Sequence, residues 1–287
     1  MNNPKKQPQL SKSKLLSAHQ CLKMLHLEWH RSDLAEVSEA TEAAYRTGNE
    51  VGDVAKQIYG TADSVEIAYR RGDTDAMVRE TADLLASGAD FPIFEATFRH
   101  KGVLVRVDVL IPVDDGWRAV EIKASTKVKP EHKIDCAIQW WVMRGVGLPV
   151  KSISLGHVNN RFVYGGDYDG LIAEEDLTEE AEALSATVPG LVGGARGAIT
   201  GEMPEIAVGT HCNKPYECSF RAQCWPQNAE YPVTGLGGSK AKHAEWVNRG
   251  ITDIRDIPVD HIQFPMVHSQ KLFHIPNPIK ALIARRG

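Results

Sequence analysis

The sequence predicts an α/β protein whose core is a mixed central sheet flanked by helices, and three observations support this class. Residues 91–125 contain three runs that alternate apolar and polar side chains, separated by turn signals. Stretches with helical spacing of apolar residues precede and follow these runs. Of the 287 residues, 43% are hydrophobic, which is enough to bury one good core with appendages. We therefore expect one main domain.

Composition narrows the class of protein. The formal net charge is −4 and the sequence pI is about 6.3, so any contact with nucleic acid must be a local patch rather than a global basic field. No apolar run approaches the length of a membrane span, and the first residues lack the apolar segment of a secretory signal. We therefore expect a soluble, cytoplasmic protein. In that compartment, five cysteines favour metal binding or burial over disulfides.

The N-terminal part of the chain predicts helices ahead of the sheet. Residues 1–10 are polar, contain two prolines and are expected to form a disordered arm. Ser11 or Ser13 is a candidate N-cap for the helix that follows. Two further helical stretches cover residues 33–59, with an interruption at the glycines of TGNEVGDVA, and residues 74–87.

Two of the predicted strands carry the reactive side chains. In VLVRVDVLI the valines alternate with other residues, so Asp108 is expected to point away from the valine face. After the turn signal Asp-Asp-Gly, the next strand places Glu121 and Lys123 on one face. These three side chains can converge across neighbouring strands, where two carboxylates suit Mg²⁺ or Mn²⁺. The alternative is a solvent-facing Glu-x-Lys on an edge strand.

The segment after these strands is rich in lysine. Lys127, Lys129 and Lys133 follow within KASTKVKPEHK. Lysines of this kind neutralise phosphates without reading bases, which makes them candidates for DNA binding. A solvated loop explains the same residues almost as well.

The helix expected after this loop carries Gln139 and two tryptophans. Trp140 can stack on bases, although a tryptophan in such a helix more often belongs to the core. A strand over residues 150–158 follows. The acidic stretch EEDLTEEAEAL is then expected to open a long surface helix with no role in binding.

A group of evenly spaced cysteines marks the C-terminal third. Cys212, Cys218 and Cys224 are six positions apart in HCNKPYECSFRAQCW, a segment rich in turn residues, and this pattern indicates metal ligands rather than packing. A cysteine among leucines, such as Cys21, is by itself most often buried, and Cys136 is expected to be an ordinary buried cysteine. Four thiolates can hold Zn²⁺ or an iron–sulfur cluster, and spacing alone does not distinguish them.

Several of these motifs occur together in one order. An Asp, a turn, Glu-x-Lys and a helix with Gln139 resemble the PD-(D/E)XK nuclease superfamily, in particular its RecB-like branch. LSKSKLLSAHQCLKMLHLEWH, DCAIQWW, LGHVNNRFVYGG and HCNKPYECSFRAQCW extend the resemblance to an uncharacterised bacterial family with a four-cysteine cluster. The same layout is similar to that of CRISPR adaptation nucleases and the AddB nuclease domain. The resemblance covers most of residues 11–226.

The resemblance implies a restriction-endonuclease-like core and a metal-dependent DNA nuclease, with exonuclease action on single-stranded DNA ends. The catalytic residues that it implies are Asp108, Glu121, Lys123 and Gln139. The implied ligands of Mg²⁺ or Mn²⁺ are Asp108, Glu121 and the carbonyl of Ile122, with Glu95 or Glu50 as further candidates. The implied ligands of a [4Fe–4S] cluster, or alternatively of zinc, are Cys21, Cys212, Cys218 and Cys224, with His211 as a substitute if Cys21 is remote.

Two positions depart from this pattern. The family places a metal-binding histidine at the position of Gly52 and often a tyrosine at that of Met143. These departures favour a rival interpretation, a catalytically weak or inactive nucleic-acid-binding module of the same fold; a second rival is a zinc-stabilised interaction protein. We expect the nuclease domain over residues 11–226, with cluster ligands at both ends, and a small helical accessory segment over residues 227–287. Such nucleases often act with helicases or in defence and repair complexes, which are the expected partners.

Overall fold

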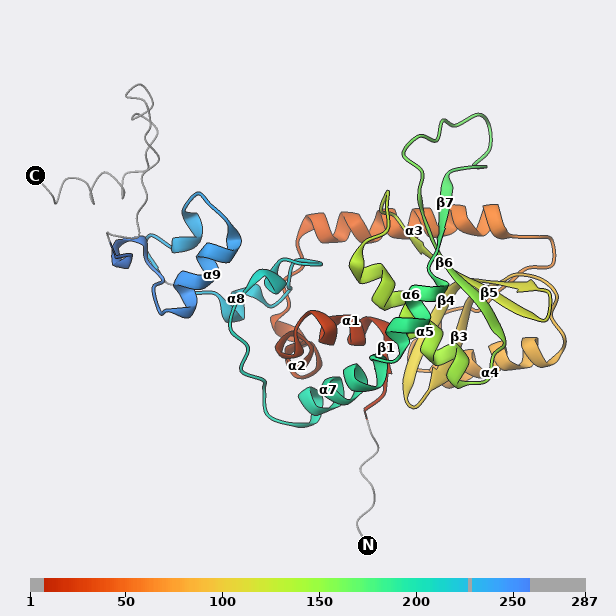
Figure 1. Cartoon of the computed structure of the whole chain (residues 1–287), viewed down its shortest axis with the longest axis horizontal. Helices are drawn as coiled ribbons and strands as arrows, with labels where there is room; N and C mark the ends of the chain where they lie inside the picture. The colour runs from red at the N-terminus through yellow and green to blue at the C-terminus, as the bar shows by residue number, and fades with distance from the viewer. Residues whose placement is uncertain (1–7, 227–228, 259–287) are drawn as a thin grey trace, which may run out of the picture. The chain divides into compact units, whose positions relative to one another are not determined.

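The computed structural model describes residues 8–226 and 229–258 (Figure 1). The chain divides into two compact units. The first comprises Met1–His30 and Val37–Pro204, and the second comprises Arg31–Glu36 and Glu205–Gly287. The expected arm over residues 1–10 lies largely outside the described residues, as does the end of the chain after residue 258.

The first unit is built around one mixed sheet, which has seven strands within the described residues. The strands are β1 (Leu10–Ser11), β2 (Val65–Glu66), β3 (Ile93–His100), β4 (Val103–Val113), β5 (Gly116–Lys123), β6 (Val150–Val158) and β7 (Ile172–Asp176). The path runs β2-β3-β4-β5-β6-β7, and β1 pairs with β4. β3, β4 and β5 form an antiparallel meander, β6 joins β5 in parallel, and β7 is antiparallel to β6. The three strands expected over residues 91–125 are therefore present.

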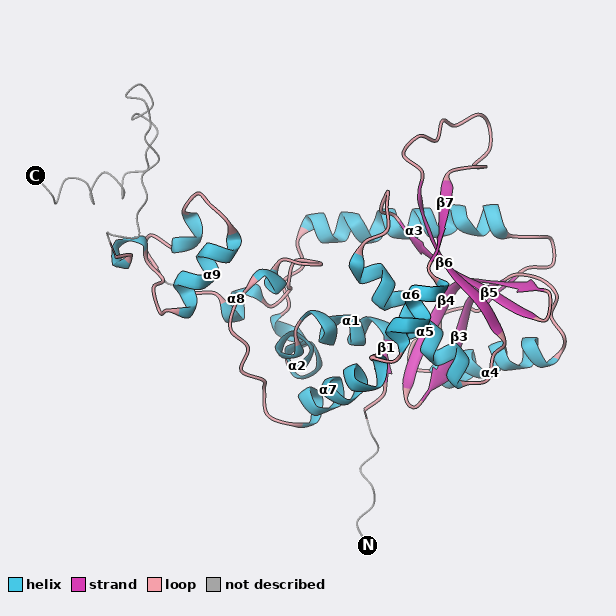
Figure 2. Cartoon of the chain, viewed as in Figure 1, coloured by secondary structure: helices cyan, strands magenta, loops and turns pink. Residues whose placement is uncertain are grey.

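Helices flank this sheet (Figure 2). They are α1 (Lys12–Gln20), α2 (Leu22–His30), α3 (Glu39–Tyr59), α4 (Thr74–Ala86), α5 (Pro130–Gly145), α6 (Thr178–Ser185) and α7 (Val188–Thr200). Ser11 is the N-cap of α1, and its hydroxyl accepts a hydrogen bond from the Lys14 amide at 3.3 Å. The order of α3, α4, three antiparallel strands, α5 and a parallel strand confirms the predicted α/β class with a mixed sheet between helices.

Two stretches differ from the predicted elements. α3 runs without the expected interruption through Gly48 and Gly52, because a glycine costs a helix only about 1 kcal/mol and α3 packs on the sheet through its apolar side chains. The acidic stretch does not form one long helix. Residues 172–176 pair with β6 as β7, and α6 ends at Ser185 before a new helix begins at Val188, with proline in its first turn.

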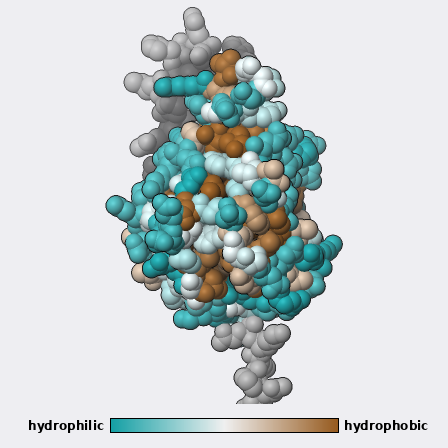
Figure 3. Space-filling view, turned by 90° about the vertical axis from the view of Figure 1, so that its right-hand side faces the viewer, coloured by the Kyte–Doolittle hydropathy of each residue, from teal (hydrophilic) through white to brown (hydrophobic). Residues whose placement is uncertain are grey.

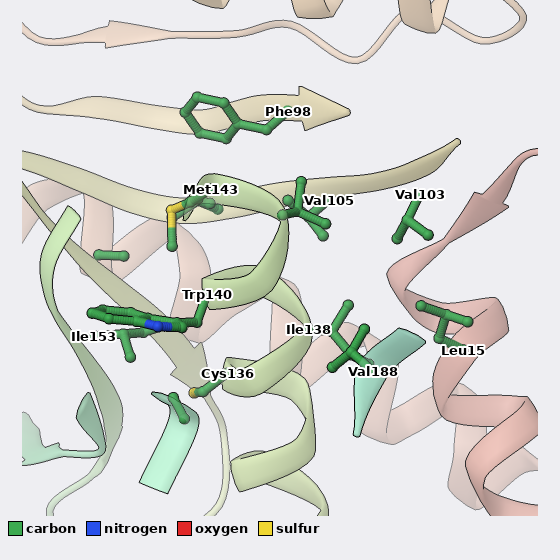
Figure 4. Packing of buried hydrophobic residues seen from close by; sticks show 14 of the residues in the cluster. Leu15, Phe98, Val103, Val105, Cys136, Ile138, Trp140, Met143, Ile153 and Val188 are labelled. Carbon is green, nitrogen blue, oxygen red and sulfur yellow. The ribbon is translucent and has the colours of Figure 1, made fainter. Parts of the chain in front are cut away.

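Two apolar clusters cover the two faces of the sheet. The larger lies on the face of α5 and includes Cys136, Ile138 and Trp140 from that helix (Figure 4). Ile153 of β6 and Phe98 of β3 pack against them. The smaller cluster lies on the face of α3, which contributes its one buried side chain among the described residues, Ala55. α5 is therefore the buried helix of the fold and α3 a surface helix.

The alternation along β3 and β4 reverses at one point. Val107 belongs to the larger cluster but Val109 to the smaller, although residues two apart on a regular strand share a face. The neighbouring strand reverses at the same level, at Glu95, whose φ of 58° lies in the left-handed region. The register Phe94↔Val109 places Glu95 opposite Asp108. The regular alternation predicted for this strand therefore breaks at Asp108.

The second unit is small and partly helical within the described residues. It contains α8 (Arg221–Cys224), α9 (Lys240–Asn248) and short 3-10 turns. Val208, Cys212, Trp225 and Ala244 form one apolar cluster. Val233, Trp246 and Ile257 form another. Within the described part of the accessory segment expected over residues 227–287, the longest helix is α9, and the 3-10 turn Ile254–Asp256 follows it.

On the face that Figure 3 shows, several hydrophobic patches lie among hydrophilic residues. In the part of the chain that the structure describes, no helix combines the length and the apolar character that crossing a bilayer requires.

Candidate active site

Glu121 is the centre of a hydrogen-bonded cluster on the α5 side of the sheet. Its side chain is only 2% exposed. Its Oε1 accepts hydrogen bonds from the Lys123 Nζ at 2.5 Å and from the Lys12 Nζ at 2.8 Å. Its Oε2 accepts one from the Gln139 Nε2 at 2.7 Å. The structure thus brings together Glu121, Lys123 and Gln139 as predicted, and adds Lys12.

Asp135 is a second buried carboxylate in this cluster and was not predicted. Its Oδ2 lies 2.7 Å from the Lys123 Nζ, and its Oδ1 lies 2.9 Å from the Lys12 Nζ. The Gln139 Nε2 also donates to Oδ1 at 3.2 Å. Asp135 and Gln139 are four residues apart on α5, so both side chains face Glu121. That spacing in DCAIQWW was the signal available in the sequence.

Asp108 reaches the site from β4. Its Oδ2 accepts a hydrogen bond from the backbone amide of Ile122 at 2.7 Å, next to Glu121 on β5. The regular pairing of β4 with β5 stops at Val109↔Val120. Beyond this pair, the Asp108 carboxylate takes the place of a backbone carbonyl as the acceptor for the β5 amide. Asp108 therefore lies beside Glu121, at the point where the alternation of β4 reverses.

Lys12 comes from a part of the chain far from the other site residues. β1 pairs with β4 through Leu10↔Val103 and Ser11↔Leu104, and α1 begins at the next residue. Lys12 is thus held at the junction of a strand and a helix, with its side chain 18% exposed. Nothing in the local sequence pattern marks this lysine, because a pairing of two residues brings it to the site.

The charges of the site are unbalanced. The site contains three carboxylates and two ammonium groups, so one formal negative charge is in excess. The carboxylates are those of Asp108, Glu121 and Asp135, and the ammonium groups are those of Lys12 and Lys123. Burial, followed by the neighbouring carboxylates, raises the pKa of Glu121 to about 7. Burial also raises the pKa of Asp108. Burial opposes ionisation of Asp135, but the two lysines outweigh it and hold its pKa below the usual range.

The donors of this site fit a hard divalent cation. Asp108 and Glu121 supply carboxylate oxygens, the ligand type that Mg²⁺ and Mn²⁺ prefer, and burial is the largest cause of their raised pKa values. Within residues 8–226 and 229–258, no three His, Cys, Asp or Glu side chains form a ready metal-binding group. The ligands of the cation would then be the carboxylates of Asp108 and Glu121, a backbone carbonyl and water molecules. Mg²⁺ is commonly held by one or two carboxylates and several waters.

The further metal candidates differ in their relation to the site. Glu95 lies opposite Asp108, but its carboxylate pairs with the Arg106 guanidinium at 3.1 Å, and burial raises its pKa. Glu50 is exposed on α3. Met143, at the position where the resemblance implies a tyrosine, is fully buried in the larger core cluster. Of these residues, Glu95 is the one that the fold places beside the carboxylates.

The predicted DNA-binding residues fall into three environments. Lys127 is exposed in the loop between β5 and α5, and Lys129 directly precedes α5. Lys133 pairs with Glu180 of α6 at 3.2 Å. Trp140 is 6% exposed and packs in the core on α5, so the geometry favours packing over stacking on a base and corrects this candidate contact.

The cysteines are divided between the two units. Cys21 lies between α1 and α2 in the first unit, and Cys212, Cys218 and Cys224 lie in the second. The Cys212 sulfur is buried, lies 3.7 Å from the His211 Nε2 and accepts a hydrogen bond from the Gly209 amide at 3.5 Å. The described residues do not present three of these side chains as one ligand group. The cluster therefore stays a prediction, whereas Cys136 is buried in the core as expected.

Comparisons with known proteins add a fold likeness only. No protein-family model matches the chain, and no curated protein matches it. A solved structure designated SSO0001 is similar with a TM-score of 0.40 and 15% identity, over 78% of this chain and 89% of that one. An alkaline exonuclease from Laribacter hongkongensis is similar with a TM-score of 0.32 and 14% identity, over 64% of this chain and 90% of that one.

Proposed function

We propose that this chain is a metal-dependent DNA nuclease that acts as an exonuclease on single-stranded DNA ends. The observation that carries the proposal is the convergence of Asp108 with Glu121 and Lys123 where the pairing of β4 with β5 stops, with Gln139 behind them. Asp108, Glu121 and the carbonyl of Ile122 would hold Mg²⁺ or Mn²⁺. When bound, the metal supplies a Lewis acid and a more acidic water at a phosphodiester.

Lys123 acts in this proposal as a cation. Burial opposes its charge, but Asp135 and Glu121 outweigh that effect and raise its pKa well above the ordinary value. A lysine that stays protonated does not take a proton from water. Its ammonium can instead neutralise the negative charge that develops on the phosphate in the transition state.

Gln139 and Asp135 position the reacting groups. Gln139 donates to both Glu121 and Asp135, so the orientation of the Glu121 carboxylate is fixed from the buried side of the site. Asp135 holds the Lys123 ammonium at 2.7 Å. Both side chains lie on α5 and are almost fully buried, which gives the site a rigid support.

An exposed aromatic pair in the loop after β6 is the candidate contact for a single-stranded substrate. Val158, at the end of β6, donates to the Ser125 carbonyl at 2.9 Å, so the loop after β6 starts beside the segment that follows Lys123. In this loop, Tyr164 and Tyr168 lie with ring centroids 5.4 Å apart, and Tyr164 is 61% exposed. Unpaired bases stack on such rings without regard to sequence.

The test is a cleavage assay on labelled single- and double-stranded DNA with Mg²⁺ or Mn²⁺. Asp108→Asn and Glu121→Gln should each lower the rate by roughly 10³-fold or more, because each removes a charged ligand of the metal that supplies the Lewis acid. Asp114→Asn, at the exposed turn between β4 and β5, is the matched control and should keep full activity. Full activity in either site variant would refute the proposal. DNA binding without cleavage by the native protein would favour the inactive binding module that Gly52 suggests.

A further inference from the structure

The N-terminal lysine of the site has no role in the proposed reaction, yet it contacts two of the buried carboxylates there. The Lys12 Nζ lies 2.8 Å from the Glu121 Oε1 and 2.9 Å from the Asp135 Oδ1. Its backbone is fixed on one side by the pairing of β1 with β4 and on the other by the start of α1. The ammonium therefore lies between the two carboxylates as a result of the fold.

Both oxygens of Glu121 are already engaged in this arrangement. Oε1 accepts from Lys12 and Lys123, and Oε2 accepts from Gln139. A divalent cation at Glu121 needs one of these oxygens as a ligand. Each carboxylate oxygen can accept about two hydrogen bonds, so the two lysines fill Oε1 while Oε2 keeps one open position. A metal that takes Oε1 as its ligand must therefore displace Lys12 or Lys123.

The structure indicates which donor gives way. Gln139 is fully buried on α5, and Lys123 lies on the same strand as Glu121 and is held by Asp135. Lys12 comes from a separate segment, so its flexible side chain can leave without any change in β5. Exposure does not distinguish the two lysines, because the side chain of Lys12 is 18% exposed and that of Lys123 is 25% exposed. When it leaves, Asp135 keeps the ammonium of Lys123 and the amide of Gln139 as partners, so no buried carboxylate loses all its donors.

We propose that Lys12 is a built-in counter-ion of the carboxylate site, which occupies Glu121 in the metal-free protein and is displaced by the divalent cation. This inference rests on the metal site of the proposed function. In the metal-free state the ammonium compensates buried negative charge that would otherwise be costly. An internal competitor also lowers the apparent metal affinity. The apparent affinity is the intrinsic affinity multiplied by the fraction of molecules in which Lys12 does not occupy the site.

The first test measures the displacement directly. Metal-free protein is treated briefly with an amine-acetylating reagent, with and without saturating Mn²⁺, and acetylation of each lysine is quantified by mass spectrometry. Lys12 should become several-fold more reactive with Mn²⁺. Lys14, two residues away and paired with Glu28 at 2.8 Å, is the internal control and should not change. Unchanged Lys12 in protein that binds Mn²⁺, or a rise at Lys123 instead, would overturn the inference.

The second test measures Mn²⁺ affinity by titration calorimetry. Lys12→Met should bind Mn²⁺ about tenfold or more tightly than the native protein, because the competitor is gone. Lys14→Met should bind as the native protein does. The double variant Lys12→Met/Asp135→Asn keeps the formal charge of the site, and it should still bind more tightly.

The outcomes of this titration separate the two proposals. Native affinity in the double variant would mean that Lys12 acts only through net charge, and would overturn the inference while leaving the nuclease proposal intact. Equal affinity of the native protein and Lys12→Met would mean that Lys12 does not compete with the metal, and would likewise overturn the inference while leaving the nuclease proposal intact. Absence of Mn²⁺ binding in the native protein would overturn both proposals, because no metal would then reach Glu121.

Discussion

The carboxylate site and the cysteine segment were both predicted from short motifs, but the predicted carboxylates lie in one unit of the chain and the predicted cysteine ligands lie in two. The carboxylates and their lysine and glutamine partners lie within hydrogen-bonding distance of one another on β4, β5 and α5. The cysteines belong to two units, and the described residues do not gather three of them as ligands. Strand register and helix periodicity place the first set. In the second unit, Cys212 ends a 3-10 turn, Cys224 ends α8, and the Cys218 amide donates to the Cys212 carbonyl at 3.0 Å.

This difference has an energetic counterpart. The carboxylate site contains three buried acids whose charges are only partly balanced, so its assembly costs free energy that packing on α5 must offset. Thiolate ligands of a structural metal behave in the opposite way, because metal binding itself supplies free energy of folding. The two regions should therefore respond differently to metal, mutation and pH.

The largest effect is expected from removing a cysteine ligand. If Cys21 and the three cysteines of the second unit hold a [4Fe–4S] cluster, anaerobically prepared protein should contain about four iron atoms per chain. Cys218→Ala should lose most of this iron, aggregate and be proteolysed more readily, because metal binding and folding are coupled. Iron and sulfide analysis with limited proteolysis would measure this.

A matched control separates ligand loss from cavity formation. Cys136→Ala removes a fully buried thiol from α5, and it should lower stability modestly while the iron content stays unchanged. Any folded Cys218→Ala protein should still cleave DNA, since Asp108 and Glu121 lie in the first unit. Stoichiometric zinc without iron would favour the zinc-stabilised alternative, and a stable metal-free native protein would exclude both metals.

The next effect concerns pH and the carboxylate site. The pKa of Glu121 is raised to about 7 from an ordinary value of 4.5, so between these values the folded protein holds a proton that the unfolded chain has lost. The free energy of unfolding of metal-free protein should therefore fall as pH rises through this window, by on the order of 1–3 kcal/mol. Burial of Asp108 acts in the same direction.

Urea unfolding in a chelator at pH 5 and at pH 7.5 would measure this slope. Glu121→Gln cannot ionise at this position, so its stability should depend less on pH than that of the native protein. Asp135 should not contribute, because its pKa is lowered and its titration falls below this window. Parallel pH profiles for the native protein and Glu121→Gln would show that the Glu121 proton is not retained on folding.

The parts of the site that could be predicted are those fixed by local pattern. The turn between β4 and β5 and the period of two along β5 place Glu121 and Lys123 correctly, and the helical pattern of residues 134–144 falls within α5. Asp135 follows the same logic, because a residue four positions before Gln139 must share its face. Local periodicity was therefore sufficient for most of the cluster.

The rest required information that no local pattern contains. Lys12 and Glu121 are 109 positions apart, and a strand of two residues brings them together. The reversal at Asp108 depends on the left-handed conformation of Glu95 on a neighbouring strand, which its residue type does not indicate. The low helix propensity of Gly48 and Gly52 suggested an interruption of α3, because propensity depends only on local sequence. Packing of α3 on the sheet keeps the helix continuous.

The smallest effect is expected from the lysines around the start of α5, and it tests whether this side of the site contacts DNA. Lys127 is exposed, and Lys129 lies at the helix start, whereas Lys133 already pairs with Glu180. Each lysine that neutralises a phosphate of single-stranded DNA contributes about 0.7 to the slope of log affinity against log salt. Lys127→Ala/Lys129→Ala should therefore reduce this slope by up to about 1.4.

Lys133→Ala, in the first turn of α5, is the matched comparison for the two lysines that precede this helix. Because Glu180 already compensates its charge, its removal should change the slope by less than about 0.7, and Glu180→Gln should steepen the slope by freeing the lysine. Binding of a fluorescent single strand to Glu121→Gln protein, which should not cleave it, can be measured across salt concentrations. An unchanged slope in the double variant would place the DNA path away from the loop between β5 and α5, and would leave the aromatic pair after β6 as the contact to examine.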